Sequence, residues 1–316
     1  MKLKLIAAAA GAAAAIAGTA GAASYTFDKV VVRRRDDDSD KLPDLNMGAD
    51  WAKHVPAILK YRAWFLSKKP QKHYIQSFDG LKLAGRYLRA NYRTHKILIG
   101  VHGYSSCSLY DFPGIAQLYH NHGFNVLLVD DRGHGDSEGE YAGFGVLDHK
   151  DVLKWIDYII KEIDPKAEIY LHGISMGGAS VLFAGGCELP ENVRAIVADC
   201  AFTSAWEEVN YIFSNKYHMP VEPLIKLTSS ICKKRAGYAF DEMNTVDSVK
   251  RIKVPVLFIH GADDTFVPVD MSKKNYEACS ANKELAIFDG AQHAESFLNN
   301  PEEYEKTVFG FLDSIK

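Results

Sequence analysis

Residues 168–178 read Glu-Ile-Tyr-Leu-His-Gly-Ile-Ser-Met-Gly-Gly, an apolar run that ends in a serine set between glycines. Its centre, residues 173–177, matches the pattern G-x-S-x-G, which presents a serine hydroxyl on a sharp turn between a strand and a helix. Glycine on either side lets the backbone turn without side chains that crowd the serine. Because five residues can match by chance, Ser175 is predicted to be a nucleophile only if its partners follow along the chain.

The acid partner is expected after a late buried strand, because the chain order in this arrangement is serine, acid, histidine. Residues 254–261 form such an apolar run, and Asp263 and Asp264 follow it. The pattern H-G-x-x-D-x-x-V-P places the acid at Asp264 and leaves Asp263 as a turn residue in water. Both aspartates stay open at this point, with Asp264 preferred.

The histidine partner is expected in a loop after the last strand. Residues 284–288 predict that strand, and His293 follows it closely. We expect His293 to take the proton of Ser175 during attack and to return it to the leaving group. The aspartate would hold the imidazole in the correct tautomer and stabilise its charged form.

An oxyanion formed by this serine needs two backbone N–H donors. Met176 is predicted to supply one, because it follows the nucleophile at the start of a helix. Tyr104 is predicted to supply the other, from the loop after the strand of residues 96–101, and its ring is also expected to line the cavity. Nearby Cys107 has no His–Asn context, so a packed thiol is expected there rather than a second nucleophile.

Together these motifs resemble the α/β-hydrolase family, in particular bacterial single-domain serine hydrolases of the esterase or serine aminopeptidase-like type. The resemblance covers roughly residues 71–314. It rests on residues 102–106 (His-Gly-Tyr-Ser-Ser), 131–139 (Asp-Arg-Gly-His-Gly-Asp-Ser-Glu-Gly), 173–177, 199–204 (Asp-Cys-Ala-Phe-Thr-Ser), 260–264 (His-Gly-Ala-Asp-Asp) and His293. It implies an α/β fold with a mostly parallel sheet of eight strands, flanked by helices, and it implies no cofactor and no metal.

The patterning agrees with that fold, because strands alternate with helical periodicity as in a parallel sheet covered on both faces. A hairpin is predicted around Asp79-Gly80. The strands are predicted at 73–78, 81–89, 97–101, 125–129, 169–171, 195–198, 254–259 and 285–288. Residues 71–316 are thus expected to form the hydrolase domain, preceded at 25–70 by a connector with a lead-in helix near 51–66.

Residues 202–250 are more than a crossover between parallel strands requires, and they predict a small helical cap. Trp206 and Phe213 lie in an amphipathic part of this insertion. We predict that they bind the apolar part of a substrate. Packing of the cap against the sheet is an equally good interpretation of each aromatic residue.

The net charge, the cysteine spacing and the absence of nucleotide-binding motifs argue against several classes of function. The net charge of −3 argues against nucleic acid as a partner, which usually requires a basic face. The five cysteines fit no zinc pattern and are expected to be mostly free. The loop at 131–137 lacks both the G-x-G-x-x-G spacing and a Walker lysine, so its charged residues are expected to be structural.

The N-terminus begins with two lysines and continues with an Ala-rich apolar stretch at residues 5–23. This resembles a secretory signal with a cleavage site at residues 20–22, and its length also approaches that of a membrane-spanning helix. Three arginines at 33–35 oppose export by the positive-inside tendency. We predict that residues 1–24 are a signal peptide or membrane anchor and that the protein is exported, secreted or tethered at the outer face of the cytoplasmic membrane. A plain Ala-rich tail is the third interpretation.

The sequence therefore predicts a serine hydrolase that cleaves small-molecule carboxylic esters through an acyl-enzyme on Ser175. The same machinery would cleave an amide or a thioester, as in peptidase and thioesterase members of the family. A non-catalytic surface binding protein that keeps only the fold is a less favoured hypothesis, because all three residue types of the triad are present.

Overall fold

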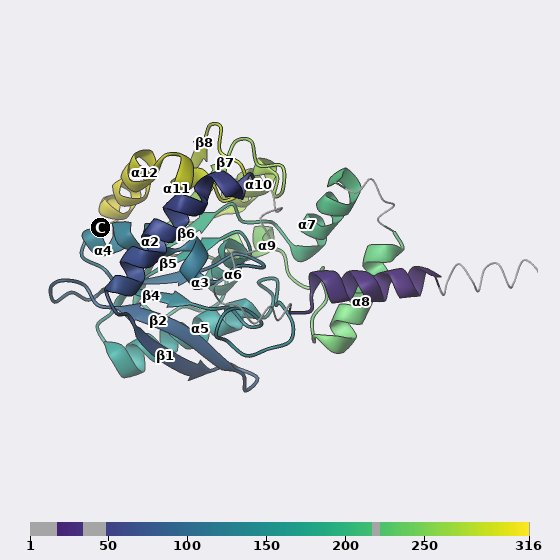
Figure 1. Cartoon of the computed structure of the whole chain (residues 1–316), viewed down its shortest axis with the longest axis horizontal. Helices are drawn as coiled ribbons and strands as arrows, with labels where there is room; N and C mark the ends of the chain where they lie inside the picture. Colours follow the sequence, from purple (N-terminus) through teal and green to yellow (C-terminus); the bar gives the residue numbers. More distant parts are fainter. Residues whose placement is uncertain (1–17, 34–48, 217–221, 316) are drawn as a thin grey trace, which may run out of the picture.

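The computed structural model describes residues 18–33, 49–216 and 222–315 (Figure 1). Its centre is an eight-stranded sheet in the order β1-β2-β4-β3-β5-β6-β7-β8. The strands are β1 (Gln71–Gln76), β2 (Lys82–Leu88), β3 (Lys96–Val101), β4 (Asn125–Val129), β5 (Glu168–Ile174), β6 (Val193–Asp199), β7 (Val256–Gly261) and β8 (Lys283–Phe288). Strands β1 and β2 pair antiparallel with their neighbours, and the other pairs are parallel. The predicted α/β-hydrolase fold with a mostly parallel sheet is confirmed.

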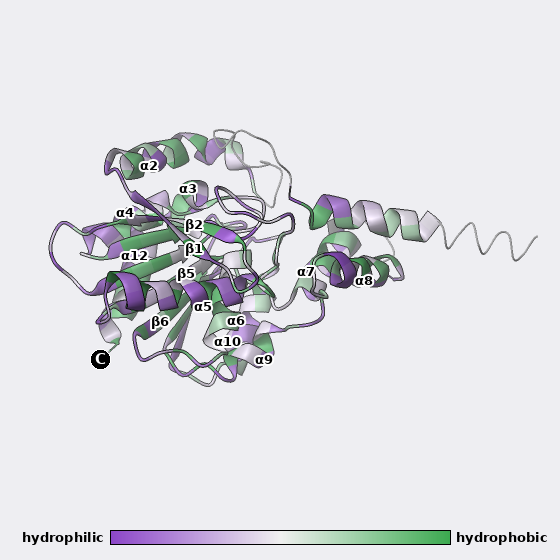
Figure 2. Cartoon of the chain, turned by 90° about the horizontal axis from the view of Figure 1, so that it is seen from below, coloured by the Kyte–Doolittle hydropathy of each residue, from purple (hydrophilic) through white to green (hydrophobic). Residues whose placement is uncertain are grey.

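Helices cover both faces of this sheet because the strands carry apolar side chains on both sides. Helices α2, α4 and α12 pack on one face, and α5, α6 and α10 pack on the other. In Figure 2 the central strands are mainly in the colour of hydrophobic residues. The helical elements are η1 (Trp51–His54), α2 (Val55–Ser67), α3 (Ser108–Asp111), α4 (Pro113–Asn121), α5 (Asp148–Tyr158), η2 (Ile159–Ile163), α6 (Met176–Gly185), α7 (Ala205–Tyr211), η3 (Ile212–Lys216), α8 (Leu224–Arg235), α9 (Thr245–Val249), α10 (Val269–Ala278), α11 (Ser296–Asn299) and α12 (Pro301–Ser314).

The insertion between β6 and β7 contains α7, η3, α8 and α9, and we call residues 202–250 the cap. Residues 18–30 form a further helix that lies beside α8 (Figure 1). Ala23, Phe27 and Val31 are fully buried, and Phe27 and Val31 belong to the apolar cluster of the cap. Their spacing of four residues puts them on one face of the helix. The boundary expected at residue 24 therefore falls inside a helix, and its apolar face binds the cap.

The lead-in helix expected near residues 51–66 is present as η1 and α2. Among the described residues, no helix has both the length and the apolar character needed to cross a bilayer. Most of the predicted signal or anchor segment, residues 1–17, lies outside the described residues.

Candidate active site

The candidate site lies where parallel strands end at the same edge of the sheet, as ligand sites of open α/β sheets generally do. Tyr104 follows β3, Ser175 follows β5, and Asp199 ends β6. Asp264 follows β7, and His293 follows β8. The order of the strands thus brings together residues that are far apart in the chain.

Ser175 occupies a strained turn between β5 and α6, with φ 55° and ψ −114°. This region is rare for residues other than glycine and is typical of functional sites. A methyl group at Gly173 would lie 2.1 Å from the carbonyl oxygen of Gly177, and one at Gly177 would lie 2.0 Å from that of Val101. Both glycines are therefore required for the turn that presents the serine.

Ser175, His293 and Asp264 form a hydrogen-bonded row. His293 Nε2 lies 2.9 Å from Ser175 Oγ, and His293 Nδ1 lies 2.8 Å from Asp264 Oδ2. All three side chains are buried. His293 is thus within hydrogen-bond distance of both Ser175 and Asp264, in the order that a serine nucleophile requires.

Asp264 is held as a carboxylate from several sides. Its Oδ1 accepts the backbone N–H groups of Phe266 and Val267, each at 2.8 Å. His260 Nε2 lies 3.1 Å from Oδ2. Burial alone would raise the pKa of Asp264, but His293 and His260 outweigh it and place the pKa well below its usual range. Asp264 is therefore ionised and able to orient the imidazole of His293.

Asp263, the competing aspartate, has a different role. Its side chain is exposed, and its backbone N–H donates to the carbonyl oxygen of Ala291 at 3.0 Å. This bond ties the loop after β7 to the loop that carries His293. The geometry thus separates the two aspartates that the sequence left open, with Asp264 against the histidine and Asp263 in water.

Of the two predicted oxyanion donors, Met176 directly follows Ser175, and Tyr104 lines the same cavity as Ser175. Met176 begins α6, so its N–H is among the first four of the helix, which have no partner within the helix. The loop that carries Tyr104 is fixed by Asp111, which accepts the Gly103 N–H at 2.8 Å and the Ser106 hydroxyl at 2.5 Å. The role of Asp111 was missed at the sequence level, because nothing in the pattern marks an aspartate in α3.

The side chain of Tyr104 has a second role, because its hydroxyl donates to the carbonyl oxygen of Val30 at 2.7 Å. Arg33 also donates to the carbonyl oxygens of Gly135 and Ser137, at 2.7 and 2.6 Å. The segment at residues 18–33 is thus bonded to the loops that surround the candidate site as well as to the cap.

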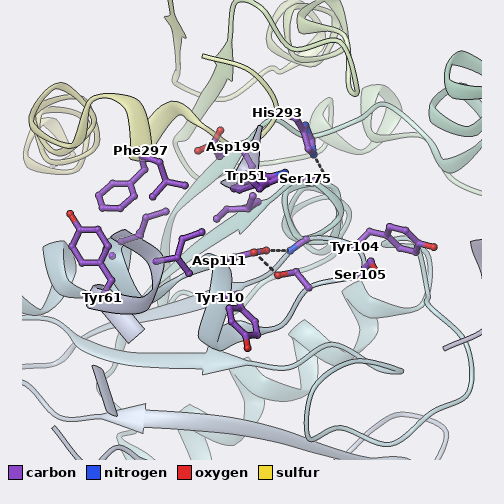
Figure 3. A pocket seen from close by; sticks show the side chains of 18 residues that line it. Trp51, Tyr61, Tyr104, Ser105, Tyr110, Asp111, Ser175, Asp199, His293 and Phe297 are labelled. Carbon is purple, nitrogen blue, oxygen red and sulfur yellow. Dashed lines mark hydrogen bonds between the residues drawn. The ribbon is translucent and has the colours of Figure 1, made fainter. Parts of the chain in front are cut away.

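A cavity of about 990 Å³, which includes space open to solvent, lies beside Ser175 (Figure 3). Its lining is mainly apolar and aromatic and comes from η1, α2, α3, α4 and α11 as well as from the strand ends. The lining residues are Trp51, Ile58, Tyr61, Gly103, Tyr104, Ser105, Ser106, Tyr110, Asp111, Gly114, Ile115, Ile174, Ser175, Asp199, His293, Ala294, Phe297 and Leu298.

Trp206 and Phe213 do not line this cavity. Both are partly buried and pack against the apolar cluster of the cap, which matches the alternative interpretation of these aromatics. The lead-in helix reaches the cavity instead, because α2 packs on α3 and α4. The apolar spacing of Ile58 and Tyr61 signals a buried helix face, but the sequence does not show that this face borders the serine.

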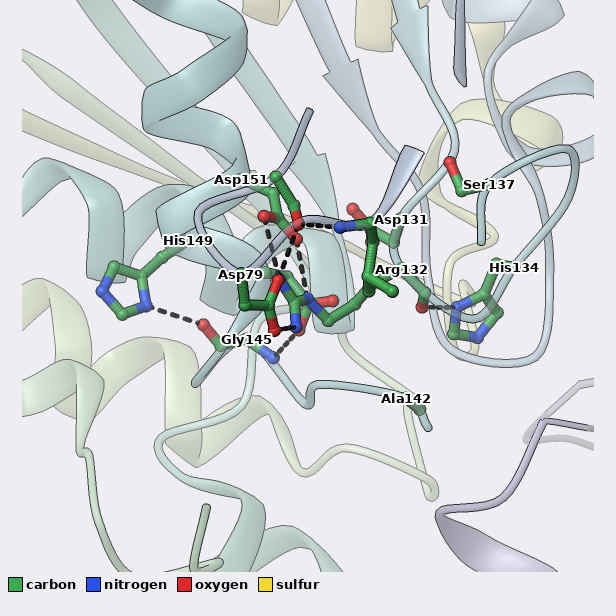
Figure 4. A network of polar contacts seen from close by, with 12 residues as sticks. Asp79, Asp131, Arg132, His134, Ser137, Ala142, Gly145, His149 and Asp151 are labelled. Carbon is green, nitrogen blue, oxygen red and sulfur yellow. Dashed lines mark hydrogen bonds and ion pairs between the residues drawn. The ribbon is translucent and has the colours of Figure 1, made fainter. Parts of the chain in front are cut away.

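The loop after β4 is held by a buried ionic network (Figure 4). Arg132 donates to Asp151 at 2.7 Å and to Asp79 at 2.9 Å, and so joins this loop to α5 and to the β1–β2 turn. Burial raises the pKa of Asp148 to about 6 and also raises that of Asp131. The charged residues of this loop therefore support the fold, and none of them lines the cavity.

The cysteines form no disulfide. Burial raises the pKa of the Cys107 thiol to about 12, so this side chain stays protonated. Among the residues that the structure describes, Cys200, Asp264 and His293 are the one set of potential metal ligands close enough to share an ion. Two of these three are already hydrogen-bonded in the row with Ser175, and burial raises the pKa of the Cys200 thiol. The closeness of these three residues is thus better explained by the hydrogen-bonded row than by a metal site.

Comparison with known proteins agrees with this fold. A family model described as "Serine aminopeptidase, S33" matches residues 92–237 and 232–300. The uncharacterized protein YqkD of Bacillus subtilis is 32% identical over 199 residues, which are 63% of this chain and 65% of YqkD. Lysophosphatidylserine lipase ABHD12 of Danio rerio is 30% identical over 205 residues, which are 63% of this chain and 51% of the lipase. The chain thus spans less than two thirds of the length of these two relatives.

Among solved structures, the Pyrococcus furiosus esterase Pf2001 is similar, with a TM-score of 0.64 and 26% identity over 79% of this chain and 94% of the esterase. The matched family segments cover more than half of the chain and include the elbow at Ser175. The protein therefore has the α/β-hydrolase fold and belongs to the serine aminopeptidase S33 family.

Proposed function

We propose that the protein is a serine esterase that cleaves carboxylic esters through an acyl-enzyme on Ser175. The observation that carries this proposal is the hydrogen-bonded row of Ser175, His293 and Asp264 at the mouth of a mainly apolar cavity. Similarity to an esterase and to a lipase supports the choice of an ester over other substrates.

In the first half of the reaction, His293 Nε2 takes the proton of Ser175 as Oγ bonds to the ester carbonyl carbon. The carbonyl oxygen becomes an oxyanion, which the backbone N–H groups of Met176 and Tyr104 stabilise. The intermediate then collapses, the bond to the alcohol oxygen breaks, and His293 returns the proton to that oxygen. The acyl group stays bonded to Ser175.

In the second half, His293 takes a proton from a water molecule, and the water oxygen attacks the acyl carbon. The bond to Ser175 Oγ then breaks, the proton passes back to Ser175, and the free acid leaves. Asp264 stabilises the charged imidazole in both halves. Its lowered pKa keeps it ionised throughout the neutral range.

Amide cleavage by the same residues is the second candidate, favoured by the family to which the chain belongs. An aminopeptidase would need a group that binds a free amine near the serine. The acidic pair in the cap does not supply it, because Glu207 accepts a hydrogen bond from Thr203 and neither Glu207 nor Glu208 lines the cavity. We therefore rank ester cleavage first.

The test is turnover of p-nitrophenyl esters of increasing acyl length by the full chain, beside an aminoacyl p-nitroanilide. Ser175→Ala is expected to abolish ester hydrolysis while the protein stays folded by circular dichroism. Ester turnover that survives in Ser175→Ala would refute the proposal. Turnover of the anilide alone would establish the peptidase, and a folded chain that is inactive on every substrate would favour a binding protein.

Export remains part of the proposal, with residues 1–24 as a signal peptide or a tether. Ala23 and Phe27 are buried, so cleavage after Ala22 would leave the packed face of the N-terminal helix on the protein. Fractionation of cells that express the full chain, with N-terminal sequencing of the product, separates the cases. A mature N-terminus at Ala23 indicates a cleaved signal, whereas an intact chain in the membrane fraction indicates a tether.

A further inference from the structure

A second buried carboxyl group lies beside the nucleophile. Asp199 ends β6, is 2% exposed and lines the cavity (Figure 3). Its carbonyl oxygen accepts the backbone N–H of Ser175 at 2.8 Å, which places the residue directly behind the elbow. The row of Ser175, His293 and Asp264 does not use its side chain.

One oxygen of this carboxyl group is held by a relay of buried side chains. Tyr304 donates to Asp199 Oδ2 at 2.8 Å, and His172 Nε2 lies 3.0 Å from the Tyr304 hydroxyl. Tyr119 completes the relay, with its hydroxyl 3.2 Å from His172 Nδ1. These side chains come from α12, β5 and α4, so three separate elements fix the position of the carboxyl group.

The relay has one consistent direction. Burial lowers the pKa of His172 to about 3, so its ring is neutral and carries a single N–H. Tyr304 uses its proton on Asp199, so its oxygen must accept the N–H from His172 Nε2. His172 Nδ1 then accepts the proton of Tyr119. Every group in the relay is satisfied, and Asp199 can only be an acceptor at Oδ2.

The other oxygen, Asp199 Oδ1, is buried and has no hydrogen-bond partner among the described residues. Buried polar atoms are normally paired, and an unpaired one is costly in free energy. Asp111, the other carboxylate of the cavity lining, contrasts with it, because both of its oxygens accept hydrogen bonds. Asp199, a residue of the cavity lining, therefore has one orientated carboxyl oxygen that the described residues leave unpaired.

We propose that Asp199 is a specificity residue, and that the preferred esters carry a hydroxyl group on the part that lies in this cavity, where it donates to Asp199 Oδ1. This inference rests on the proposed esterase function and names its substrate class. A plain hydrocarbon chain would fill the apolar walls but would leave Oδ1 unpaired. A hydrocarbon chain with a hydroxyl group at the right position would contact the apolar walls and also donate a hydrogen bond to Oδ1.

A neutral donor fits this cavity better than a charged one. An ammonium group carries three N–H donors and a charge, and all three donors need partners when it is buried. A hydroxyl group carries one donor, which matches the one unpaired oxygen of Asp199. The other carboxylate of the lining, Asp111, already accepts hydrogen bonds at both oxygens, and the apolar side chains of Ile58 and Phe297 accept none.

The test compares kcat/KM for esters that differ only by a hydroxyl group. Ethyl hexanoate is set against its 3-hydroxy and 6-hydroxy derivatives, and hexyl acetate against 6-hydroxyhexyl acetate, so that the acyl and alcohol sides are both probed. A hydrogen bond to a carboxylate predicts a preference of about tenfold to a hundredfold for one hydroxylated member. Asp199→Leu is expected to abolish this preference while plain esters are still cleaved.

Two further variants test whether the preference depends on the orientated carboxyl group of Asp199. Tyr304→Phe keeps the carboxyl group but removes the donor that orientates it, so the preference should fall. Tyr61→Phe removes a hydroxyl group from another wall of the same cavity and should leave the preference intact. A preference lost in Tyr61→Phe and kept in Asp199→Leu would overturn the assignment.

The wild-type enzyme offers a readout that needs no variant. Burial raises the pKa of Asp199 to about 6, against the opposing effects of Tyr304, His260 and His293, while Asp264 adds to the rise. The ratio of kcat/KM for a hydroxylated ester to that for its plain partner cancels the titration of His293, which both share. This ratio should increase as the pH rises through about 6, because the ionised carboxylate is the stronger acceptor.

The outcomes separate the two proposals. If no ester is cleaved through Ser175, the esterase function itself fails. If plain esters are cleaved through Ser175 but no hydroxylated partner is preferred at any pH, the esterase stands and the role of Asp199 is refuted. A preference for an aminoacyl ester over every hydroxylated ester would refute the neutral donor.

Discussion

Glu295 joins the loop of His293 to the wall of the cavity, and Glu295→Gln should weaken the packing of both. Its side chain is fully buried. It accepts from His54 and Lys53 of η1, each at 2.9 Å, and from the backbone N–H of Gln292 at 3.0 Å. The carboxylate thus fixes η1 and α2 against the loop that presents His293.

The size of the effect follows from these contacts. Glutamine keeps the shape of the side chain, but its NH₂ group faces donors, so at least one hydrogen bond from His54 or Gln292 is lost. A hydrogen bond to a charged group contributes about 1.5–3 kcal/mol, and the half-exposed pair with Lys53 contributes at most about 1 kcal/mol. We expect a loss of about 2–4 kcal/mol in the free energy of unfolding, which for a chain of this length lowers Tm by about 3–6 °C.

The effect of Glu295→Gln on Tm is expected to depend on pH. Burial acts to raise the pKa of Glu295, but the hydrogen bonds from Lys53, the Gln292 N–H and His54 outweigh it and lower the pKa. A lowered carboxyl pKa stabilises the fold above the usual glutamate value of about 4.3, and this stability is lost as the pH falls through the lowered value. The difference in Tm between wild type and Glu295→Gln should therefore be full at pH 7 and narrow below about pH 4.

The assay is thermal unfolding from pH 3.5 to 8, together with KM for long-chain p-nitrophenyl esters, which should rise because Trp51 and Ile58 of the cavity wall are less firmly held. Glu302→Gln is the matched control, since this exposed glutamate at the start of α12 undergoes the same change of charge. If Glu295→Gln unfolds at the wild-type temperature at pH 7, the link between η1 and the histidine loop does not hold the structure as argued.

Four further substitutions test three other parts of the structure. Asp264→Asn should lower kcat by about 10⁴-fold, and Asp263→Asn should change it little; equal losses would contradict the assignment of the acid. Gly177→Ala should prevent folding or abolish activity, because the new methyl group would lie 2.0 Å from the Val101 carbonyl oxygen, and a folded, active variant by circular dichroism and ester assay would disprove this. Burial raises the pKa of Asp148 to about 6, so its ionisation costs about 3 kcal/mol above that pH and nothing below about pH 4. Asp148→Asn should accordingly raise Tm at pH 7.5 more than at pH 4.5, and a pH-independent difference would count against it.

The sequence predicted the sheet well because its strands are apolar runs separated by turn and helix signals. The predicted and observed strands differ mainly at their ends. For example, β7 begins after Pro255, which has no N–H for the ladder, rather than at Val254. The close approach of Ser175, Asp264 and His293 was also predictable, because each lies in the turn or loop after a strand and the strand ends meet at one edge.

The cavity wall was not predictable in the same way. Trp206 and Phe213 have the aromatic character of substrate-binding residues, and only the packing of the cap shows that they contact its apolar cluster. In the sequence, Trp51 and Tyr61 belong to what reads as an ordinary amphipathic helix before the hydrolase domain. Only the packing of α2 on α3 and α4 brings them to the cavity. Hydrophobic periodicity reports that a helix face is buried, and it does not report what that face is buried against.

This difference between the hydrogen-bonded row and the cavity wall determines which properties can be inferred from related proteins. The family match begins at residue 92, so it includes the row of Ser175, His293 and Asp264. It leaves out the cavity residues of η1 and α2, and the N-terminal helix that bonds to Tyr104 through Val30. The chemistry of the bond that is broken can thus be argued from the shared part, whereas the shape of the cavity also depends on residues 51–61, which lie outside it. Asp199, Ile115 and Phe297 lie inside the shared part, whereas Trp51, Ile58 and Tyr61 form the part of the cavity wall that lies outside it. Substrate preference must therefore be measured on a chain that keeps its N-terminal segments, because a core cut at the family boundary would lose one side of the cavity.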